Sequence, residues 1–483
     1  MIRKLFFTCM LFLATACWNQ AGAVVYNIKD YGAVGDGKVI DSPAINKAIE
    51  VAAEAGGGTV FFPAGDYLSY SIRLKSHIHL ILDTGARLIA AFPSETEGYD
   101  EAEENEHNQF QDFGHSHWKN SLIWGIGLED IAITGRGTIY GMGLTREESR
   151  LKGVGNKAIS LKLCKNVLLR DLTMLNCGHF GLLATGVDNM TIDNLLIDTN
   201  RDGLDIDCCK NLRISNCTIN APWDDAIVLK ASYGLGYFKD TENVTISDCF
   251  VSGYDKGSVA DGTFQRLEPQ APDHGFVTGR IKFGTESSGG FKNISITNCI
   301  FERCRGLALE SVDGGLLEDI VINNITMRDI VNAPLFLRLG SRMRSPEGTP
   351  VGKMRRISIS NVNVYNADSR YACIISGVPG HVVEDVSLSN IRIHFKGGYT
   401  EEEGKIVPPE NEKGYPEPWM FGTIPASAFF VRHARNICFD KVQVSFEKDD
   451  YRPGFVLTDA EDIRLEDVRV ALPEGVELIN NRE

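Results

Sequence analysis

A nine-residue phrase recurs along the chain and constrains its fold more than any other feature. The phrase alternates apolar and polar positions around an internal Asn or Asp, and its clearest copies begin at Asn166, Asn189, Asn211, Asn243 and Asn293. Alternation with a period of two residues is typical of β-strands with one buried face. The first three copies begin 23 and 22 residues apart. A repeat of this length, built only of short strands, predicts a solenoid whose coils stack one upon the next.

The predicted architecture is an all-β parallel β-helix. No single coil can bury its own apolar side chains, so stacking of the coils would form one continuous core. Wider gaps, such as the 50 residues from Asn243 to Asn293, would hold long loops on one face. Residues 42–56 have helical spacing and end in the first of three consecutive glycines. We therefore expect a short helix that caps the amino-terminal end of the solenoid.

The amino terminus has the composition of a secretory signal. A basic start precedes a short apolar run, and residues 21–23, Ala-Gly-Ala, fit a cleavage site. We expect an exported protein, periplasmic or secreted, with a signal peptide over residues 1–23 and one mature domain over residues 24–483. Cys17 leaves an outer-membrane lipoprotein as the alternative. No later apolar run reaches the roughly eighteen residues that a membrane span needs.

The formal net charge of −15 at pH 7 argues against general nucleic-acid binding, which needs a basic face. An acidic chain can still bind an anionic sugar polymer if the binding site itself is locally basic. The charge therefore directs attention to local clusters of Lys and Arg.

Three of the twelve cysteines share one position of the repeat, namely Cys217, Cys249 and Cys299. Other copies carry Leu or Ile at this position, which favours buried core thiols over disulfides. A pair between Cys299 and Cys304 stays open at this point.

Five aspartates gather in one short segment, in two groups: Asp202, Asp205, Asp207, Asp224 and Asp225. Asp202 lies 13 residues after Asn189, and Asp224 lies 13 residues after Asn211. Side chains in equal phase would stand on adjacent rungs, roughly 4.8 Å apart along the axis. The spacing therefore predicts that Asp202 lies beside the Asp224–Asp225 pair.

Three crowded carboxylates cannot all ionise freely, so repulsion and partial desolvation should leave one of them protonated. A protonated acid beside ionised carboxylates can hydrolyse a glycosidic bond, because one group protonates the leaving oxygen while another activates water or attacks. A surface ladder of Asn and Asp side chains, or a calcium site, is the alternative interpretation. We predict that Asp202, Asp224 and Asp225 are catalytic, with no cofactor and no metal.

Two passages resemble a known family. Residues 26–67 are similar to the opening segment of the pectate-lyase-like β-helix superfamily, and residues 122–143, LIWGIGLEDIAITGRGTIYGMG, resemble a passage of glycoside hydrolase family 28. That family contains the polygalacturonases and rhamnogalacturonan hydrolases. The resemblance implies a single-stranded right-handed parallel β-helix and hydrolysis of pectin with inversion of configuration.

The family's Asn-Thr-Asp motif corresponds here to Asn200-Arg201-Asp202, and its paired aspartates correspond to Asp224-Asp225. By this resemblance, Asp224 is the general acid, while Asp202 and Asp225 position or activate water. Asp205, in the GLDID run that follows the motif, is expected to bind substrate.

Two departures from the family pattern concern substrate recognition. The matching stretch lacks the family histidine in register, and His274 lies too early; His179, one coil before Asp202, either takes its place or is a surface histidine near the cleft. The Arg-Ile-Lys with which polygalacturonases grip a galacturonate carboxylate corresponds to a strand with Ala308 and Glu310 in those places.

A separate set of basic residues could bind a planar carboxylate instead: Lys230, Arg280, Lys282 and Arg338. Arginine pairs well with carboxylates, so we predict that this set lines the cleft. Taken singly, each residue is equally well explained as solvated surface charge. Glu286, on the strand of Lys282, is expected to accept hydrogen bonds from sugar hydroxyls.

Two long loops, residues 97–121 and 396–422, are rich in aromatic residues. Trp118, Tyr415 and Trp419 either stack on sugar rings or pack the loops onto the solenoid. Loops of this length would close a groove into a pocket, which indicates action on chain ends or on short oligosaccharides. The histidines of the first loop lack the spacing of a zinc motif.

The sequence thus favours a glycoside hydrolase that cleaves α-linked galacturonate-containing bonds in homogalacturonan or rhamnogalacturonan. The first alternative is a pectic lyase on the same fold, in which the aspartates hold calcium and Arg280 or Lys282 is the base. The second is a non-enzymatic, glycan-binding β-helix. In each case the expected partner is a pectic poly- or oligosaccharide.

Overall fold

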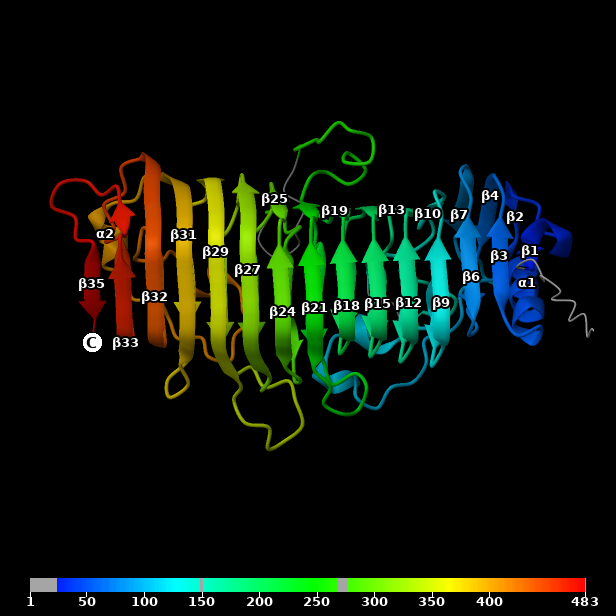
Figure 1. Cartoon of the computed structure of the whole chain (residues 1–483), viewed down its shortest axis with the longest axis horizontal. Coiled ribbons are helices and arrows are strands. Elements are labelled where there is room, and N and C mark those ends of the chain that lie inside the picture. Colours follow the sequence, from blue (N-terminus) through cyan, green and yellow to red (C-terminus); the bar gives the residue numbers. More distant parts are fainter. Residues whose placement is uncertain (1–23, 148–150, 268–275, 483) are drawn as a thin grey trace, which may run out of the picture.

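The computed structural model describes residues 24–147, 151–267 and 276–482. These residues form one long parallel β-helix, with its coils stacked from α1 at one end to β35 at the other (Figure 1). The predicted fold class is therefore confirmed. The predicted signal peptide, Cys17 and His274 lie outside the described residues.

Each full coil contributes three strands, and equivalent strands of successive coils pair in parallel. The first stack contains β5 (Ile72–Arg73), β8 (Ser121–Ile126), β11 (Lys157–Lys162), β14 (Phe180–Thr185), β17 (Asp202–Asp207), β20 (Ile227–Ala231), β23 (Ile281–Ser287), β26 (Leu307–Ser311), β28 (Leu335–Leu339) and β30 (Cys373–Ser376). The second contains β1 (Val25–Asn27), β3 (Gly58–Phe62), β6 (Ile78–Leu82), β9 (Glu129–Thr134), β12 (Lys165–Arg170), β15 (Asp188–Asp193), β18 (Lys210–Ser215), β21 (Thr241–Ser247) and β24 (Phe291–Thr297).

The third stack contains β2 (Asp36–Ile40), β4 (Gly65–Ser69), β7 (Ala86–Ala90), β10 (Thr138–Tyr140), β13 (Thr173–Leu175), β16 (Leu196–Asp198), β19 (Thr218–Asn220), β22 (Phe250–Ser252) and β25 (Ile300–Glu302). Toward the carboxyl end, long bent strands serve more than one stack: β27 (Leu316–Arg328), β29 (Lys353–Ala367), β31 (Val383–Gly397), β32 (Phe429–Lys448) and β33 (Phe455–Glu466). The short β34 (Arg469–Val470) and β35 (Ile479–Arg482) complete the solenoid.

The repeated phrase builds the coil as the sequence predicted. In the copy from Asn166, the apolar side chains of Val167, Leu169 and Met174 are buried in the core. Asn166 itself adopts a left-handed conformation, with φ of 56°, which asparagine tolerates better than most residues. Equivalent asparagines of successive coils then join side chain to side chain; the Asn189 Nδ2 donates to Asn166 Oδ1 at 3.1 Å. An external asparagine ladder therefore runs along the solenoid.

The predicted capping helix is α1 (Ser42–Glu54). It buries Ile45, Ala48, Ile49 and Ala52 against the first coils and so covers the open apolar end of the core. The remaining helices are short: α2 (Glu401–Gly404), η1 (Ile28–Tyr31), η2 (Asn108–Phe110), η3 (Phe113–Ser116) and η4 (Pro418–Phe421).

The cysteines behave as core residues. Cys217, Cys249 and Cys299 are 1–2% exposed, and each lies on a successive rung. All cysteines of the described residues are unpaired, so the Cys299–Cys304 disulfide does not form. The interpretation as buried core thiols is confirmed.

Long insertions border the face formed by the first stack, at both ends of its strands. Residues 91–120 and 398–428 precede first-stack strands, whereas residues 340–352 follow one. Because strands of the first stack have loops at both ends, the wall that they form lies in a trough.

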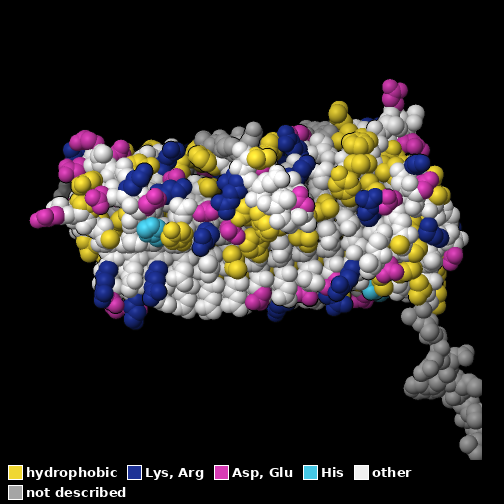
Figure 2. Space-filling view, turned by 90° about the horizontal axis from the view of Figure 1, so that it is seen from above, with side chains coloured by type: hydrophobic (Ala, Val, Ile, Leu, Met, Phe, Trp, Pro, Cys, Tyr) yellow, Lys and Arg dark blue, Asp and Glu magenta, His cyan; other side chains and the backbone are white. Residues whose placement is uncertain are grey.

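The surface bears charges of both signs. Lys and Arg side chains are interspersed with Asp and Glu over the face seen from above (Figure 2). In the part of the chain that the structure describes, no helix has the length and apolarity that crossing a bilayer requires.

Candidate active site

The two aspartate groups meet in the first stack, as their spacing predicted. Strand β17 pairs with β20 so that Leu204 lies opposite Ile227, and the Gly203 N–H donates to the Asp225 carbonyl at 3.1 Å. Asp202 therefore faces Asp225 rather than Asp224, one residue away from the predicted register. One carboxylate oxygen from each of Asp202, Asp224 and Asp225 lies within 4.8 Å of the other two.

Within this trio, the surroundings of Asp202 favour the protonated carboxyl most strongly. Its side chain is almost fully buried, with 3% exposure. Burial, and next the negative charge of Asp224, raise the pKa of Asp202 well above its usual value. The expectation that crowding leaves one carboxylate protonated fits this environment.

The other two aspartates are held by cations. Arg201 Nη2 donates to Asp224 Oδ2 at 2.6 Å, and Arg280 Nε donates to Asp225 Oδ1 at 2.9 Å. Burial favours a protonated Asp224, but the charges of Arg201 and Lys282 outweigh it and lower the Asp224 pKa. The two opposite pKa shifts thus favour a proton on Asp202 over one on Asp224, the residue that the family resemblance assigns as the acid.

A cavity of about 430 Å³ opens on one side of the trio, and charged side chains line most of it. At its base, the Lys230 ammonium contacts Asp205 at 3.2 Å, Glu286 at 3.1 Å and the His115 ring. Burial disfavours the charged lysine, but Asp205 and Glu286 outweigh this effect and raise the Lys230 pKa well above its usual value. The ammonium therefore occupies the centre of this carboxylate group.

His179 lines the same cavity, one rung before Asp202. Its ring is 2% exposed, and its Nδ1 has no hydrogen-bond partner. Burial, and next the charge of Arg201, lower the pKa of His179 well below its usual value, so the ring is neutral. A neutral imidazole with an unused nitrogen can exchange a hydrogen bond with a sugar hydroxyl.

A second cavity of about 300 Å³ lies on the other side of the trio and has an aromatic wall: Trp223, Tyr415 and Trp419. The Tyr415 and Trp419 ring planes are 9° from parallel. Arg305 Nη1 donates to Glu417 at 2.9 Å, and Arg280 binds the same carboxylate. Arg201, Asp224, Asp225, Lys282 and Tyr415 line both cavities. Asp224 and Asp225 therefore stand between the two cavities, and Asp202 lines the first of them.

Glu310 lies beneath the second cavity and is fully buried. Burial raises the pKa of Glu310 to about 8, although Lys282 and Arg280 act in the opposite direction. Its carboxyl oxygens are 3.6 Å from Lys282 Nζ and 3.9 Å from Arg280 Nη2. Glu310, which occupies the position of the family's lysine, thus faces Arg280 and Lys282.

Seven of the ten predicted site residues line the first cavity: Asp202, Asp224, Asp225, His179, Lys230, Lys282 and Glu286. Arg280 lines the second. Asp205 is fully buried behind the first cavity, where it accepts hydrogen-bond contacts from Lys230 and His115. Asp205 therefore positions these two side chains instead of facing a substrate.

Arg338 corrects the prediction that it lines the cleft. Its side chain is 1% exposed, and its Nη1 donates to Ser376 Oγ and to the Gly377 carbonyl. Its Nη2 donates to the carbonyl of Glu410 at 3.1 Å. Arg338 therefore ties residues 396–422 to the solenoid and lies outside both cavities.

The loops contribute residues that the sequence did not identify as site residues. The His115 Nε2, from residues 97–121, lies 2.9 Å from Asp205 Oδ2, and Glu417 accepts a hydrogen bond from Arg280. Trp118, in contrast, is fully buried and packs on Phe180 and Leu183, so it fastens its loop to the solenoid. Only Arg201 had a sequence signal, because it replaces the threonine of the family motif.

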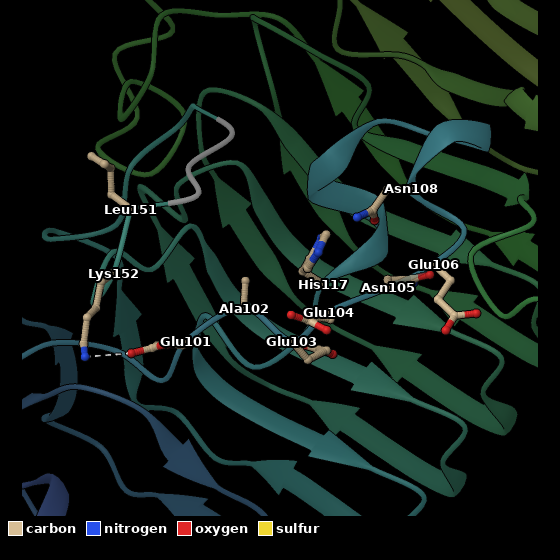
Figure 3. A pocket seen from close by; sticks show the side chains of 10 residues that line it. All are labelled: Glu101, Ala102, Glu103, Glu104, Asn105, Glu106, Asn108, His117, Leu151 and Lys152. Carbon is tan, nitrogen blue, oxygen red and sulfur yellow. Dashed lines mark ion pairs between the residues drawn. The ribbon is translucent and has the colours of Figure 1, made fainter.

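A separate hollow of about 470 Å³ is lined mainly by residues 101–108 of the loop 97–121 (Figure 3). Four glutamates line it, and Lys152 forms an ion pair with Glu101 at 3.0 Å. Glu103 accepts hydrogen bonds from the backbone N–H groups of Trp118 and Lys119. This hollow contains none of the three aspartates, and Glu103 serves to hold the loop that carries His115.

Two family models match the chain: "Rhamnogalacturonase A/epimerase, pectate lyase-like" over residues 25–122 and "Right handed beta helix region" over residues 113–265. A probable polygalacturonase of Vitis vinifera is 25% identical over 418 residues, which span 79% of this chain and 76% of that protein. The plasmin- and fibronectin-binding protein A of Streptococcus pneumoniae is 31% identical over 280 residues, or 51% of this chain and 34% of that protein.

Among solved structures, the family 28 exopolygalacturonase of Yersinia enterocolitica covers 91% of this chain and 78% of its own, with a TM-score of 0.68 and 17% identity. The fold is a right-handed parallel β-helix, and residues 25–122 are similar to the pectate-lyase-like family model. Over most of its length, the chain is similar in sequence to plant proteins named probable polygalacturonase and exopolygalacturonase.

Proposed function

We propose that this protein hydrolyses α-linked galacturonate-containing bonds of pectin, in homogalacturonan or rhamnogalacturonan. The observation that carries the proposal is the aspartate trio between two cavities, with one protonated carboxyl beside two carboxylates held by cations. The relationship to proteins named polygalacturonase supports the same reaction class.

The reaction needs a proton on the glycosidic oxygen and a base for water. The trio has one proton to deliver, because Asp202 retains it through burial. Asp225, which lies between Arg280 and Lys282, is fixed for the role of base or water ligand. By the family resemblance, Asp224 delivers the proton, which requires that the proton moves from Asp202 once substrate is bound.

Inversion of configuration rests on the family resemblance. Inverting pairs of carboxyl groups are usually about 6.5–9.5 Å apart, and retaining pairs about 5–5.5 Å. The closest oxygens of the trio lie within 4.8 Å, so separation alone does not favour inversion. We propose a single displacement by water; following the product anomer by NMR during digestion tests it, and a retained α anomer would refute inversion.

We further propose that the enzyme acts on chain ends or short oligosaccharides. Residues 97–121 and 396–422 supply His115, Tyr415, Glu417 and Trp419 to the cavity walls, so the loops enclose the trio on both sides. Comparing the size of early products from a long polymer tests this directly. Monomer or dimer release supports end attack, and a rapid fall in mean chain length contradicts it.

The primary test is incubation with homogalacturonan and rhamnogalacturonan oligosaccharides, followed by product analysis. Shorter, saturated products from either substrate are expected. Unchanged chain length after prolonged incubation with both would overturn the proposal.

A calcium-dependent lyase is the second candidate, favoured by the close carboxylate oxygens of the trio. The cations weigh against it. Burial lowers the pKa of Lys282, but Glu310, Tyr415 and Asp225 outweigh it and raise that pKa well above its usual value. A lysine that keeps its proton is a poor base. Loss of activity with a chelator, together with ultraviolet-absorbing unsaturated products, would establish this candidate instead.

A non-enzymatic binding protein is the third candidate, favoured by the similarity to a pneumococcal plasmin- and fibronectin-binding protein. That similarity spans about half of the chain. A binding surface has no need of a buried carboxyl that retains its proton, which is why we favour hydrolysis. Glycan binding without any change of sugar chain length would support the binding role.

A further inference from the structure

Arg201 stands at the junction of the two cavities. It lines both of them, and its side chain is 21% exposed. Its Nη2 donates to Asp224 Oδ2 at 2.6 Å. The guanidinium therefore reaches the one aspartate of the trio that the family resemblance assigns as the acid.

The donors of Arg201 are only partly used. A guanidinium carries five N–H donors in a planar fork, but the Nε of Arg201 is buried and has no hydrogen-bond partner. Two other cations of the site each contact two carboxylates of the protein. Arg280 binds Asp225 and Glu417, and Lys230 binds Asp205 and Glu286. Among the described residues, Arg201 thus has fewer protein partners at hydrogen-bond distance than Arg280 or Lys230.

Arg280 and Lys282 also line the second cavity, but each is already paired with acids of the protein. Arg280 and Lys282 face the buried carboxyl of Glu310, at 3.9 Å and 3.6 Å. A carboxylate on the substrate would compete there with protein acids. At Arg201 it would displace the hydrogen bond to Asp224, whose side chain is 27% exposed; Asp202 and Glu147 add negative charge nearby.

We propose that Arg201 binds a carboxylate of the substrate at the junction of the two cavities and exchanges Asp224 for it. The inference rests on the proposed function and names the residue that recognises a uronic acid. The guanidinium and the substrate carboxylate both keep their charges during the exchange. Asp224, no longer paired, takes the proton of Asp202, and that proton then passes to the leaving glycosidic oxygen. Asp202 becomes ionised and can act on water.

This exchange accounts for the position of the proton before binding. Arg201 and Lys282 lower the pKa of Asp224 while the site is unliganded. Only a substrate with a carboxylate at the junction relieves the first of these effects. Cleavage would therefore be restricted to bonds next to a uronic acid.

The test compares galacturonate oligosaccharides with the same oligosaccharides after methyl esterification of every carboxyl group. We expect the natural protein to have a higher kcat/KM on the free acid than on the methyl ester. Arg201→Gln should reduce this ratio by about tenfold or more, because a hydrogen bond between charged groups contributes about 1.5–3 kcal/mol. Most of the loss should appear in KM for the free acid. Arg435→Gln is the matched control. Arg435 lies on β32 and forms an exposed ion pair, 2.5 Å long, with Glu384 on β31, so this variant also removes one paired arginine.

An Arg201→Gln protein with the natural preference for the free acid would overturn the proposal, as would an equal loss on both substrates. If Arg201→Gln does not fold, as judged by circular dichroism, Arg201→Lys decides by the same ratio, because lysine keeps the charge but cannot form the planar fork. If the natural protein cleaves both substrates equally, the role of Arg201 is refuted but the proposed function is not. A natural protein that cleaves neither refutes the proposed function.

Discussion

Two groups of polar side chains occupy equivalent positions on successive coils, and they have different roles: the external asparagine ladder and the aspartate trio. In the external ladder, Asn211 Nδ2 donates to Asn189 Oδ1 at 3.1 Å, and the amides stay exposed. In the first stack, Asp202 and Asp225 stand on neighbouring rungs, and both are 3% exposed. Both groups arise from the same repeat geometry.

The difference lies in charge and burial. A neutral amide has a donor and an acceptor, so each asparagine satisfies the next one, and stacking stabilises the fold. Ionised carboxylates have only acceptors, so stacking them under burial stabilises neither and leaves one protonated. The solenoid thus obtains a structural ladder from amides and a reactive cluster from acids.

The largest expected effect is a loss of activity when an aspartate of the trio is replaced by asparagine, the residue type of the ladder. Asp224→Asn removes the acid and should lower kcat by about a thousandfold or more, because general acid catalysis by itself contributes about 10²–10⁴. Asp385→Asn is the matched control: Asp385 occupies the ladder, where it accepts from Asn436 Nδ2 at 2.8 Å, and other copies carry Asn there. Equal activity of the two variants on galacturonate oligosaccharides would contradict the assignment.

The next prediction concerns the pH dependence of kcat/KM. Activity should fall as pH rises through the raised pKa of Asp202, since the trio then loses its proton. Arg201→Gln removes a positive charge that favours ionised carboxylates, so the basic limb should move to higher pH. Initial rates at low substrate concentration, over a series of buffers, measure this limb. A basic limb at the pH of an ordinary exposed carboxyl would show that the trio holds no extra proton.

Stability should also depend on pH through Glu310. The folded-state pKa of about 8 lies above the usual value for glutamate, so the folded protein binds this proton more tightly than the unfolded chain. This contribution is present in full below the unfolded pKa and is lost as pH rises through about 8. Glu310→Gln should therefore lose less stability between pH 5 and pH 9 than the natural protein; parallel Tm profiles would contradict a buried, protonated Glu310.

The smallest expected effect concerns one rung of the ladder. Asn211→Ala removes two side-chain hydrogen bonds and forces alanine into φ of 60°, so unfolding should cost about 1–2 kcal/mol less. Asn211→Gly removes the same hydrogen bonds but tolerates the backbone, and should lose less than alanine does. Urea unfolding measures both variants, with activity on oligosaccharides as the control. A larger loss for glycine than for alanine would show that backbone strain is not the cause.

The repeat predicted the coil and the meeting of the aspartates, and the helical spacing of residues 42–56 predicted the cap, because these patterns depend on local sequence. Phase alone missed the one-residue shift that brings Asp202 opposite Asp225, since one rung takes an extra residue before β20. His115 and Glu417 could not be predicted, because loops have no period that fixes where their side chains end. Arg338 was wrongly predicted to line the cleft. It lies on the first stack of strands, but its guanidinium donates to the backbone carbonyls of Gly377 and Glu410.

The most direct measurement is a comparison by NMR of galacturonate oligosaccharides digested with the natural protein, Asp224→Asn and Asp385→Asn. The account predicts new saturated reducing ends with the natural protein and Asp385→Asn, and none above background with Asp224→Asn. Unsaturated ends, or the same rate with Asp224→Asn as with the natural protein, would contradict hydrolysis by the aspartate trio.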